Sequence, residues 1–261
     1  MTRPFSRMLL NRPLALHLDY AAALAAAWSE DPGTRDTDRG FGLINGVAVI
    51  PVRGMLLPGD FAWGDWATGY DHIRRGMAAA VAATDVRGIA LDINSPGGTV
   101  SGLFDLADAI HAARGPKPIH AILGDSAYSA AYAIASAADK VTVPRTGGTG
   151  SIGVIWMHVD ESQALEQGGW AVTILTHGAQ KADGAPQKPL SDGARTRIQS
   201  DIDAMGELFV KTVARNRNLD AASVRAMEAG TFLGDRGVRA GLADAVRAPD
   251  EAFRDLTAAS G

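Results

Sequence analysis

The sequence predicts an α/β fold with a mainly parallel sheet, because short apolar runs rich in β-branched residues alternate with segments of helical apolar spacing. Residues 86–93, "VRGIALDI", are apolar almost throughout, as expected for a strand buried on both faces of a parallel sheet. The chain has 261 residues, of which 46% are hydrophobic and 21% charged, so it can build a full core. We therefore expect a single domain of repeated strand–helix units with a helical C-terminal part.

Residues 1–40 are expected to form an N-terminal helical arm and a linker. We predict an amphipathic surface helix over 14–28, and the polar, turn-rich "SEDPGTRDTDRG" at 29–40 is typical of a linker. Polar residues interrupt each apolar run before it reaches the roughly 18 residues of a membrane span or the core of a signal peptide. The sequence thus indicates a soluble protein that stays in the cytoplasm.

A main domain is expected at residues 41–250, with 251–261 as a C-terminal tail. Apolar runs predict strands at 43–56 (one or two strands), 86–93, 118–123, 140–143 and 170–175. Helical spacing predicts helices at 70–85, 101–113, 132–138 and 161–168, a long helix from about Ser191 to Arg215, and two short closing helices. The inner face of the long helix is expected to carry Ile198, Ile202, Met205, Phe209 and Val213.

Composition excludes several classes of function. The formal net charge is −4, so no basic excess is available to neutralise the phosphates of a nucleic acid. The chain has no cysteine, which rules out disulfides, a thiol nucleophile and a thiolate metal site. We expect no metal site and no cofactor.

Two glycine-rich loops could serve a ligand. The first, "DINSPGGTV" at residues 92–100, leaves the buried strand and enters a helix. Gly97 and Gly98 would let backbone N–H groups approach a phosphate or an oxyanion there. The second, "GGTGSIGVI" at 147–155, is by itself typical of a flexible loop.

A serine nucleophile is the chemistry that the stretch "GDSAYSAAYAIASAADK" at 124–140 favours. Ser129 follows a predicted strand and precedes a predicted helix, where a serine exposes its hydroxyl and the next backbone N–H can stabilise an oxyanion. Ser126 is a rival, whereas Ser136 lies two helical turns further on and is interpreted as structural.

The base that such a serine needs is not fixed by local pattern. Each of the six histidines is more readily interpreted as a structural or solvated side chain. A desolvated lysine can serve, and Lys181 lies among small residues, whereas Lys188 has the neighbours of a surface residue.

Four motifs occur in order along the chain: "LDINSPGG", "SAYSAAYAIASAADK", "TGSIGVI" and "HGAQKADGAP", followed by "TFLGDRGVRAGLADAV" near the C-terminus. Together they resemble the signal peptide peptidase A family of serine peptidases, over about residues 45–247. The resemblance implies the Clp-peptidase/crotonase-like fold and a Ser–Lys dyad.

The site residues that the resemblance implies are Ser129 as nucleophile, Lys181 as general base and Ser151 as the serine that holds the lysine amine. An oxyanion hole would be formed at Gly97 and Gly98 together with the N–H of Ala130. The family commonly has Ser-Gly-Gly-Tyr where this chain has Ser129-Ala130-Ala131-Tyr132, which narrows the space beside the nucleophile slightly.

Within the family, the residues of these motifs are most similar to those of the tailed-phage branch of head or prohead peptidases, the minor capsid protein C-like peptidases. The resemblance then implies processing of scaffold or capsid proteins, inside a phage prohead, by a homo-oligomer. Capsid, portal or scaffold proteins would be its partners. A loop with Trp63 and Trp66 is a candidate contact between copies. The alternatives are a general signal-peptide-degrading peptidase of a bacterium, a crotonase-like coenzyme A enzyme and a non-catalytic capsid scaffold protein.

Overall fold

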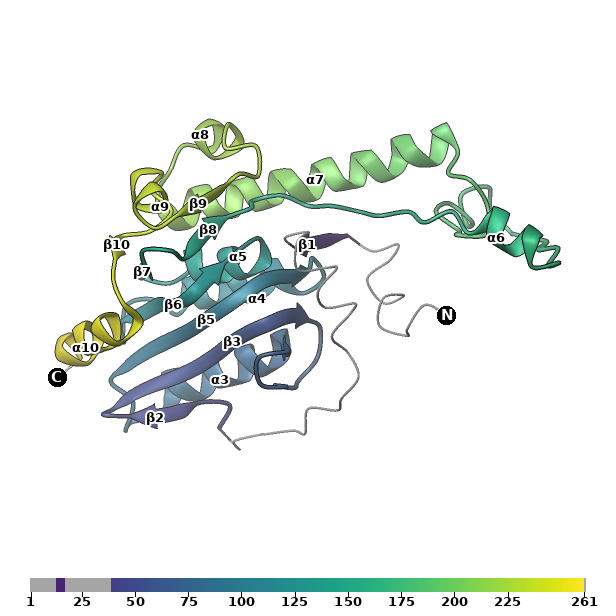
Figure 1. The fold of residues 1–261 in the computed structure, drawn as a ribbon. Helices are drawn as coiled ribbons and strands as arrows, with labels where there is room; N and C mark the ends of the chain where they lie inside the picture. The colour runs from purple at the N-terminus through teal and green to yellow at the C-terminus, as the bar shows by residue number, and fades with distance from the viewer. Residues whose placement is uncertain (1–12, 17–38, 261) are drawn as a thin grey trace.

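The computed structural model of the chain describes residues 13–16 and 39–260. Its centre is an eight-stranded sheet in the order β10-β7-β6-β5-β3-β2, with β1 paired to β5 and β4 paired to β3 (Figure 1). The strands are β1 (Leu14–Leu16), β2 (Gly42–Ile44), β3 (Val47–Leu57), β4 (Ala67–Gly69), β5 (Gly88–Thr99), β6 (Ile119–Ala127), β7 (Lys140–Val143) and β10 (Ala245–Val246). All pairings are parallel except β2 with β3 and β1 with β5. The expected α/β class is confirmed.

The two faces of the sheet are covered unequally. Helices α3 (Tyr70–Ala82), α4 (Leu103–Ala112) and α5 (Ala130–Ser136) share one large core with alternate residues of β3, β5 and β6. On the other face, α10 (Pro249–Ala259) buries Ala252 and Leu256 against the intervening strand residues. Because both faces of the central strands are covered, continuous apolar runs form them, as the sequence predicted.

The β2–β3 hairpin shows how sequence sets local geometry at the far edge of the sheet. Its turn residues Asn45 and Gly46 have φ of 51° and 79°, the left-handed values that a tight two-residue hairpin turn requires. The carbonyl of Gly46 accepts a hydrogen bond from the N–H of Arg87 at 2.7 Å, which ties the hairpin to the start of β5.

Helix α7 (Asp192–Arg217) has caps of the expected kind at both ends. The Ser191 side chain accepts a hydrogen bond from the N–H of Ala194, and Asn218 ends the helix in a left-handed conformation with φ of 52°. Of the predicted inner stripe, Phe209 and Val213 are buried, whereas Ile198, Ile202 and Met205 are partly exposed. Only the C-terminal half of α7 therefore packs against the main hydrophobic core.

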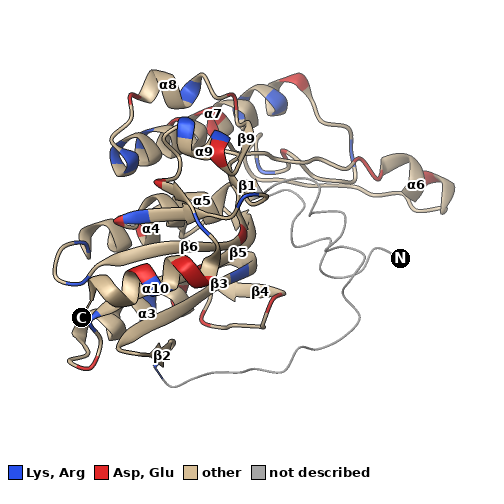
Figure 2. Cartoon of the chain, turned by 60° about the vertical axis from the view of Figure 1, so that its left-hand side comes forward, with Lys and Arg blue, Asp and Glu red and all other residues tan. Residues whose placement is uncertain are grey.

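A projecting segment, called here the arm, comprises residues 156–191 and contains α6 (Ser162–Gln167). It follows β8 (Gly148–Gly150), which pairs with β9 (Thr231–Leu233), and runs beside α7 to a point beyond the sheet (Figure 1). Charges of both signs lie on the outer helices, whereas α5 has none (Figure 2). None of the helices in the described ranges is long and apolar enough to cross a membrane.

Several sequence-based expectations about elements were wrong. Residues 14–16 form a strand, whereas the rest of the helix predicted at 14–28 lies outside the described residues. Residues 170–175 pair with no other strand of the described chain. The expected tail at 251–261 is mostly α10, and α8 (Ala221–Arg225) and α9 (Asp235–Arg239) precede it, so three short helices close the chain.

Candidate active site

The candidate nucleophile Ser129 lies between the end of β6 and the start of α5, as the sequence predicted. Its side chain is almost fully buried, with 1% exposure, and its backbone has φ of 53° and ψ of −117°. L-residues rarely adopt this conformation, which costs about 1–3 kcal/mol and persists only where surrounding contacts enforce it. Strain of this kind at a strand-to-helix turn is a property of activated serines.

Backbone hydrogen bonds hold Ser129 in this strained conformation. The N–H of Ser129 donates to the carbonyl of Gly150 at 2.9 Å, and its Oγ donates to the carbonyl of Gly153 at 3.4 Å. Its own carbonyl accepts from the N–H of Ala133 at 3.0 Å, inside α5. The loop at 148–153 therefore holds the serine, and its first three residues form the short strand β8.

The glycine loop of β5 lies directly against the start of α5. A Cβ placed on Gly97 would lie 3.1 Å from the backbone nitrogen of Ala130, and one on Gly98 would lie 1.8 Å from the carbonyl oxygen of Leu56. The N–H of Gly97 donates to Oγ of Ser95 at 3.1 Å, so this N–H already has a partner. Gly98 and Ala130 are thus the better donors for an oxyanion, and Gly97 leaves the space beside them open.

The strand β1 lies antiparallel to this glycine loop. Leu14, Ala15 and Leu16 are the register partners of Thr99, Gly98 and Gly97. This neighbour was not foreseen from the sequence, since the segment was predicted to be helical. The alternating "LAL" before a polar residue was the one available signal of a strand.

The two rival serines have structural partners. Oγ of Ser126 accepts from the N–H of Gly148 at 3.2 Å, and Oγ of Ser136 donates to the carbonyl of Ala133 at 2.8 Å. Ser136 also accepts from Nδ2 of Asn216 at 3.0 Å, in agreement with its interpretation as structural.

Polar contacts anchor helix α5 both through Tyr132 in its first turn and at its C-terminal end. The hydroxyl of Tyr132 donates to the carbonyl of Leu242 at 2.9 Å, and burial raises the pKa of Tyr132 far above its ordinary value. The guanidinium of Arg114 donates to the carbonyls of Ser136, Ala137 and Ala138, which end the helix. The helix that follows the nucleophile is therefore a fixed element, and Tyr132 stays neutral.

Ser151 lies in the loop at 148–153, which is joined to Ser129 by hydrogen bonds. Its φ is 55°, and its N–H donates to the carbonyl of Gly230 at 2.9 Å. Gly150 and Gly153, on either side of it, both accept hydrogen bonds from Ser129. The structure thus brings Ser151, Ser129, Gly97, Gly98 and Ala130 into one region.

Lys181 is not brought to this region within the chain. It lies on the arm, where its N–H donates to the carbonyl of Gly178 at 3.2 Å and its side chain is exposed. The buried setting expected for a neutral lysine is absent around it here, and no hydrogen bond joins it to Ser129 among the described residues.

No histidine in the described part of the chain bonds to Ser129. His72 is buried beside Asp60 and Arg75, and His158 lies 3.3 Å from the carbonyl of Ala185. Burial lowers the pKa of His120, whose Nδ1 has no hydrogen-bond partner among the residues that the structure describes. Across residues 13–16 and 39–260, no group of three or more metal-ligating side chains occurs.

Parallel strands, a glycine loop and a strained serine at a helix start define the class of Clp-peptidase-like α/β folds. The family model for Clp protease matches residues 67–146, which confirms the fold expected from the resemblance. The model for peptidase family S49 matches residues 111–261, more than half of the chain.

Relatives from two phages match most of the chain. The head-tail preconnector protein GP5 of Enterobacteria phage P21 is 38% identical over 231 residues, 88% of this chain and 46% of the relative. The capsid assembly protease C of Escherichia phage lambda is 38% identical over 232 residues, 88% of this chain and 53% of the relative. A putative signal peptide peptidase from Enterococcus faecium is 32% identical over 176 residues, 66% of this chain and 50% of the relative.

This chain belongs to peptidase family S49. It spans about half the length of the relatives that it matches.

Proposed function

We propose that the chain is a serine endopeptidase that uses Ser129 as nucleophile, Lys181 as general base and Ser151 to orient the lysine amine. The observation that carries this proposal is the strained, buried Ser129, set beside the glycine loop and the N–H of Ala130. In this arrangement the hydroxyl attacks a peptide carbonyl, and the N–H groups of Gly98 and Ala130 stabilise the oxyanion.

The test is hydrolysis of an unfolded protein such as casein by the full chain, followed as new amino termini. We expect turnover by the natural sequence and none by Ser129→Ala, whose circular dichroism should be unchanged. Turnover that persists in Ser129→Ala would assign the chemistry to another residue, with Ser126 the first to examine.

We propose further that assembly of several copies completes the site. The arm exposes apolar side chains that have no cover within the described chain, among them Trp170 at 72% and Leu175 at 90% exposure. Exposed apolar surface of this extent is typical of an interface. An arm docked on a neighbouring copy would bury these side chains and could place Lys181 beside a serine. The loop with Trp66, which is 38% exposed, is a second candidate contact.

Sedimentation at micromolar concentration tests the assembly directly. The proposal predicts a defined homo-oligomer, and a monomer that is fully active would contradict it. Trp63 is a weaker candidate for the interface than the sequence suggested, because it stacks on Phe61 at 4.4 Å and packs beside Leu14.

The physiological substrates that we propose are scaffold or capsid proteins of a phage head, with the peptidase acting inside the prohead or in the cytoplasm. Support comes from the names of the two phage relatives, one a capsid assembly protease and one a head-tail preconnector protein. Coexpression with candidate head proteins tests this: size changes should appear with the natural chain and vanish with Ser129→Ala.

A further inference from the structure

The strand β1 is held on both of its edges, as a peptide in a binding groove would be. On one edge it pairs antiparallel with Gly97–Thr99 of β5. On the other edge, the N–H and the carbonyl of Leu14 both bond to Ile155, at 2.8 Å each. An extended segment added between two strands is a common mode of peptide recognition.

The hydrogen-bond pattern fixes which carbonyl of β1 faces the glycine loop. The N–H of Val100 donates to the carbonyl of Pro13 at 3.3 Å. Since hydrogen-bonded pairs alternate along an antiparallel ladder, Ala15 and Gly98 form the next such pair, while Leu14 faces Ile155. The carbonyl of Ala15 therefore points at the N–H of Gly98.

The same carbonyl lies at the proposed oxyanion hole. A Cβ on Gly97 would lie 2.2 Å from the carbonyl oxygen of Ala15, 3.1 Å from its carbonyl carbon and 3.1 Å from the nitrogen of Ala130. The Ala15 carbonyl and the residue after Ser129 thus meet on the same side of Gly97. A scissile carbonyl occupies this position in acyl transfer.

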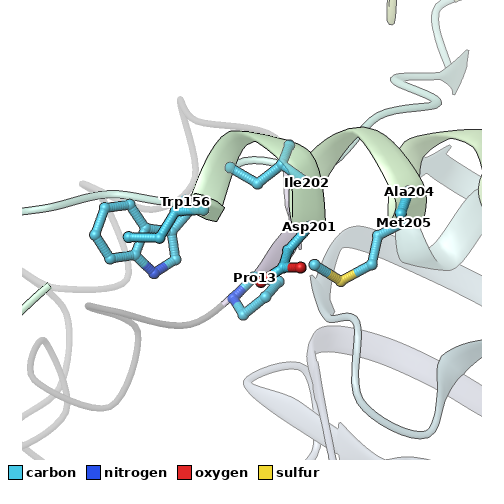
Figure 3. A pocket seen from close by; sticks show the side chains of 7 residues that line it. Pro13, Trp156, Asp201, Ile202, Ala204 and Met205 are labelled. Carbon is cyan, nitrogen blue, oxygen red and sulfur yellow. The ribbon is translucent and has the colours of Figure 1, made fainter. Parts of the chain in front are cut away.

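The side chains of Leu14 and Ala15 are buried in different apolar clusters. Leu14 is fully buried in an apolar cluster with Met55, Leu57 and Ala67, and Ala15 is fully buried in the main core. Pro13 borders a pocket of about 400 Å³ between the arm and α7, lined also by Trp156, Ile202 and Met205 (Figure 3). At position 14 the groove thus accepts a large aliphatic side chain, in the cluster around Leu14. At position 15 it has room only for a small side chain.

We infer that residues 13–16 are a self-processing site, whose Ala15–Leu16 peptide bond is cut by Ser129. The inference rests on the proposed serine peptidase function. It also predicts the preference for other substrates: a small residue before the cut and an aliphatic residue one position earlier.

The chemical step follows from this placement. Oγ of Ser129 bonds to the carbonyl carbon of Ala15, and its proton passes to the neutral amine of the base. The bond from Ala15 to the nitrogen of Leu16 then breaks, and this nitrogen takes the proton and becomes a new amino terminus. Water hydrolyses the acyl-serine, which leaves a carboxylate on Ala15 and restores the hydroxyl.

The test is intact-mass spectrometry and N-terminal sequencing of the full chain during incubation, with casein hydrolysis measured in the same sample. We expect a product that begins at Leu16, absent from Ser129→Ala. An intact N-terminus in a sample that hydrolyses casein overturns the self-processing site but leaves the peptidase function standing. Failure of both reactions overturns both proposals.

A substitution at the small position sharpens the test. Ala15→Trp should reduce the cut after residue 15 at least 100-fold, because the Ala15 side chain has no exposed surface and is packed in the main core. Ala112→Trp, at an exposed position at the end of α4, should leave the cut unchanged. A cut that proceeds equally in Ala15→Trp, or maps elsewhere, would contradict the assignment.

Discussion

The surroundings of Ser129 and the arm that carries Lys181 differ in almost every physical respect. Ser129 is 1% exposed, strained and held by three hydrogen bonds to two segments of the chain, the loop at 148–153 and α5. The arm has exposed apolar side chains, a six-residue helix with no buried residue and an exposed Lys181. A nucleophile and an oxyanion hole need rigid packing, because their geometry must be in place before the substrate binds.

The difference teaches that the two halves of the proposed dyad depend on different interactions. The serine half is complete within one folded chain, whereas the lysine half lacks the burial that would make its amine neutral. Changes that disturb the packing around Ser129 should therefore affect stability as well as chemistry. Changes on the arm should affect chemistry while the folded chain keeps its stability.

The largest expected effect is the loss of activity in Lys181→Met. Loss of either member of a catalytic dyad removes nearly the whole covalent mechanism, so we expect kcat to fall on the order of 10⁴- to 10⁶-fold. The melting temperature should not change, because the side chain is exposed on the arm. Lys188→Met, also exposed on the arm, is the matched control and should keep full activity.

Gly97→Ala should come next, with kcat lower by roughly 10²- to 10³-fold in peptide hydrolysis. The added methyl group would occupy the place of the carbonyl oxygen of Ala15 and lie close to the nitrogen of Ala130. Gly115→Ala separates this effect from backbone strain, because Gly115 has a similar φ of 113° and open space around it. Gly97→Ala should lose more stability than Gly115→Ala because of its contact with Ala15, so kcat is compared per folded molecule. Equal kcat in the two variants would refute a role of Gly97 in the site.

Ser151→Ala should lower kcat by about 10- to 1,000-fold, on the order of 1.4–4 kcal/mol, with KM little changed. A hydroxyl that orients the lysine amine is worth less than the nucleophile itself. If Ser151 only shapes its strained turn at φ of 55°, the variant would instead melt earlier with normal kcat. Steady-state kinetics and a melting curve on one sample distinguish these results.

The smallest expected effect concerns the stability of the folded chain at acid pH. It arises from His120 in β6, which lies in the packed part of the molecule and not on the arm. Burial holds the pKa of His120 below its ordinary value of about 6.5, so the unfolded chain binds the proton first. Stability from this group is present above pH 6.5 and is lost as the pH falls through the folded-state pKa. In His120→Leu, the difference in melting temperature between pH 7 and pH 5 should shrink. An unchanged difference would show that His120 does not contribute.

The fold was largely predictable from the sequence because its signals are local. Continuous apolar runs marked β5 and β6, and helical spacing marked α3 and α4. The position of Ser129 between a strand and a helix was also predictable, since small residues at a strand-to-helix turn are a local pattern.

What the sequence did not predict depends on distant partners. The alanine-rich start at 14–28 favoured a helix, yet β1 is a strand because β5 and Ile155 offer it two sets of hydrogen bonds. Residues 170–175 have the composition of a strand but find no partner in the described chain. Helix α10 joins the core through Leu256, which meets β3, β5 and β6 only after folding.

The relation between the two halves is tested most directly by mixing Ser129→Ala and Lys181→Met proteins. Each alone should be inactive. If a neighbouring copy supplies the lysine, the mixture should regain a substantial part of the natural rate after the two proteins are unfolded and refolded together. A mixture that assembles normally but stays inactive would contradict the account, because it would show that Ser129 and Lys181 must belong to the same chain.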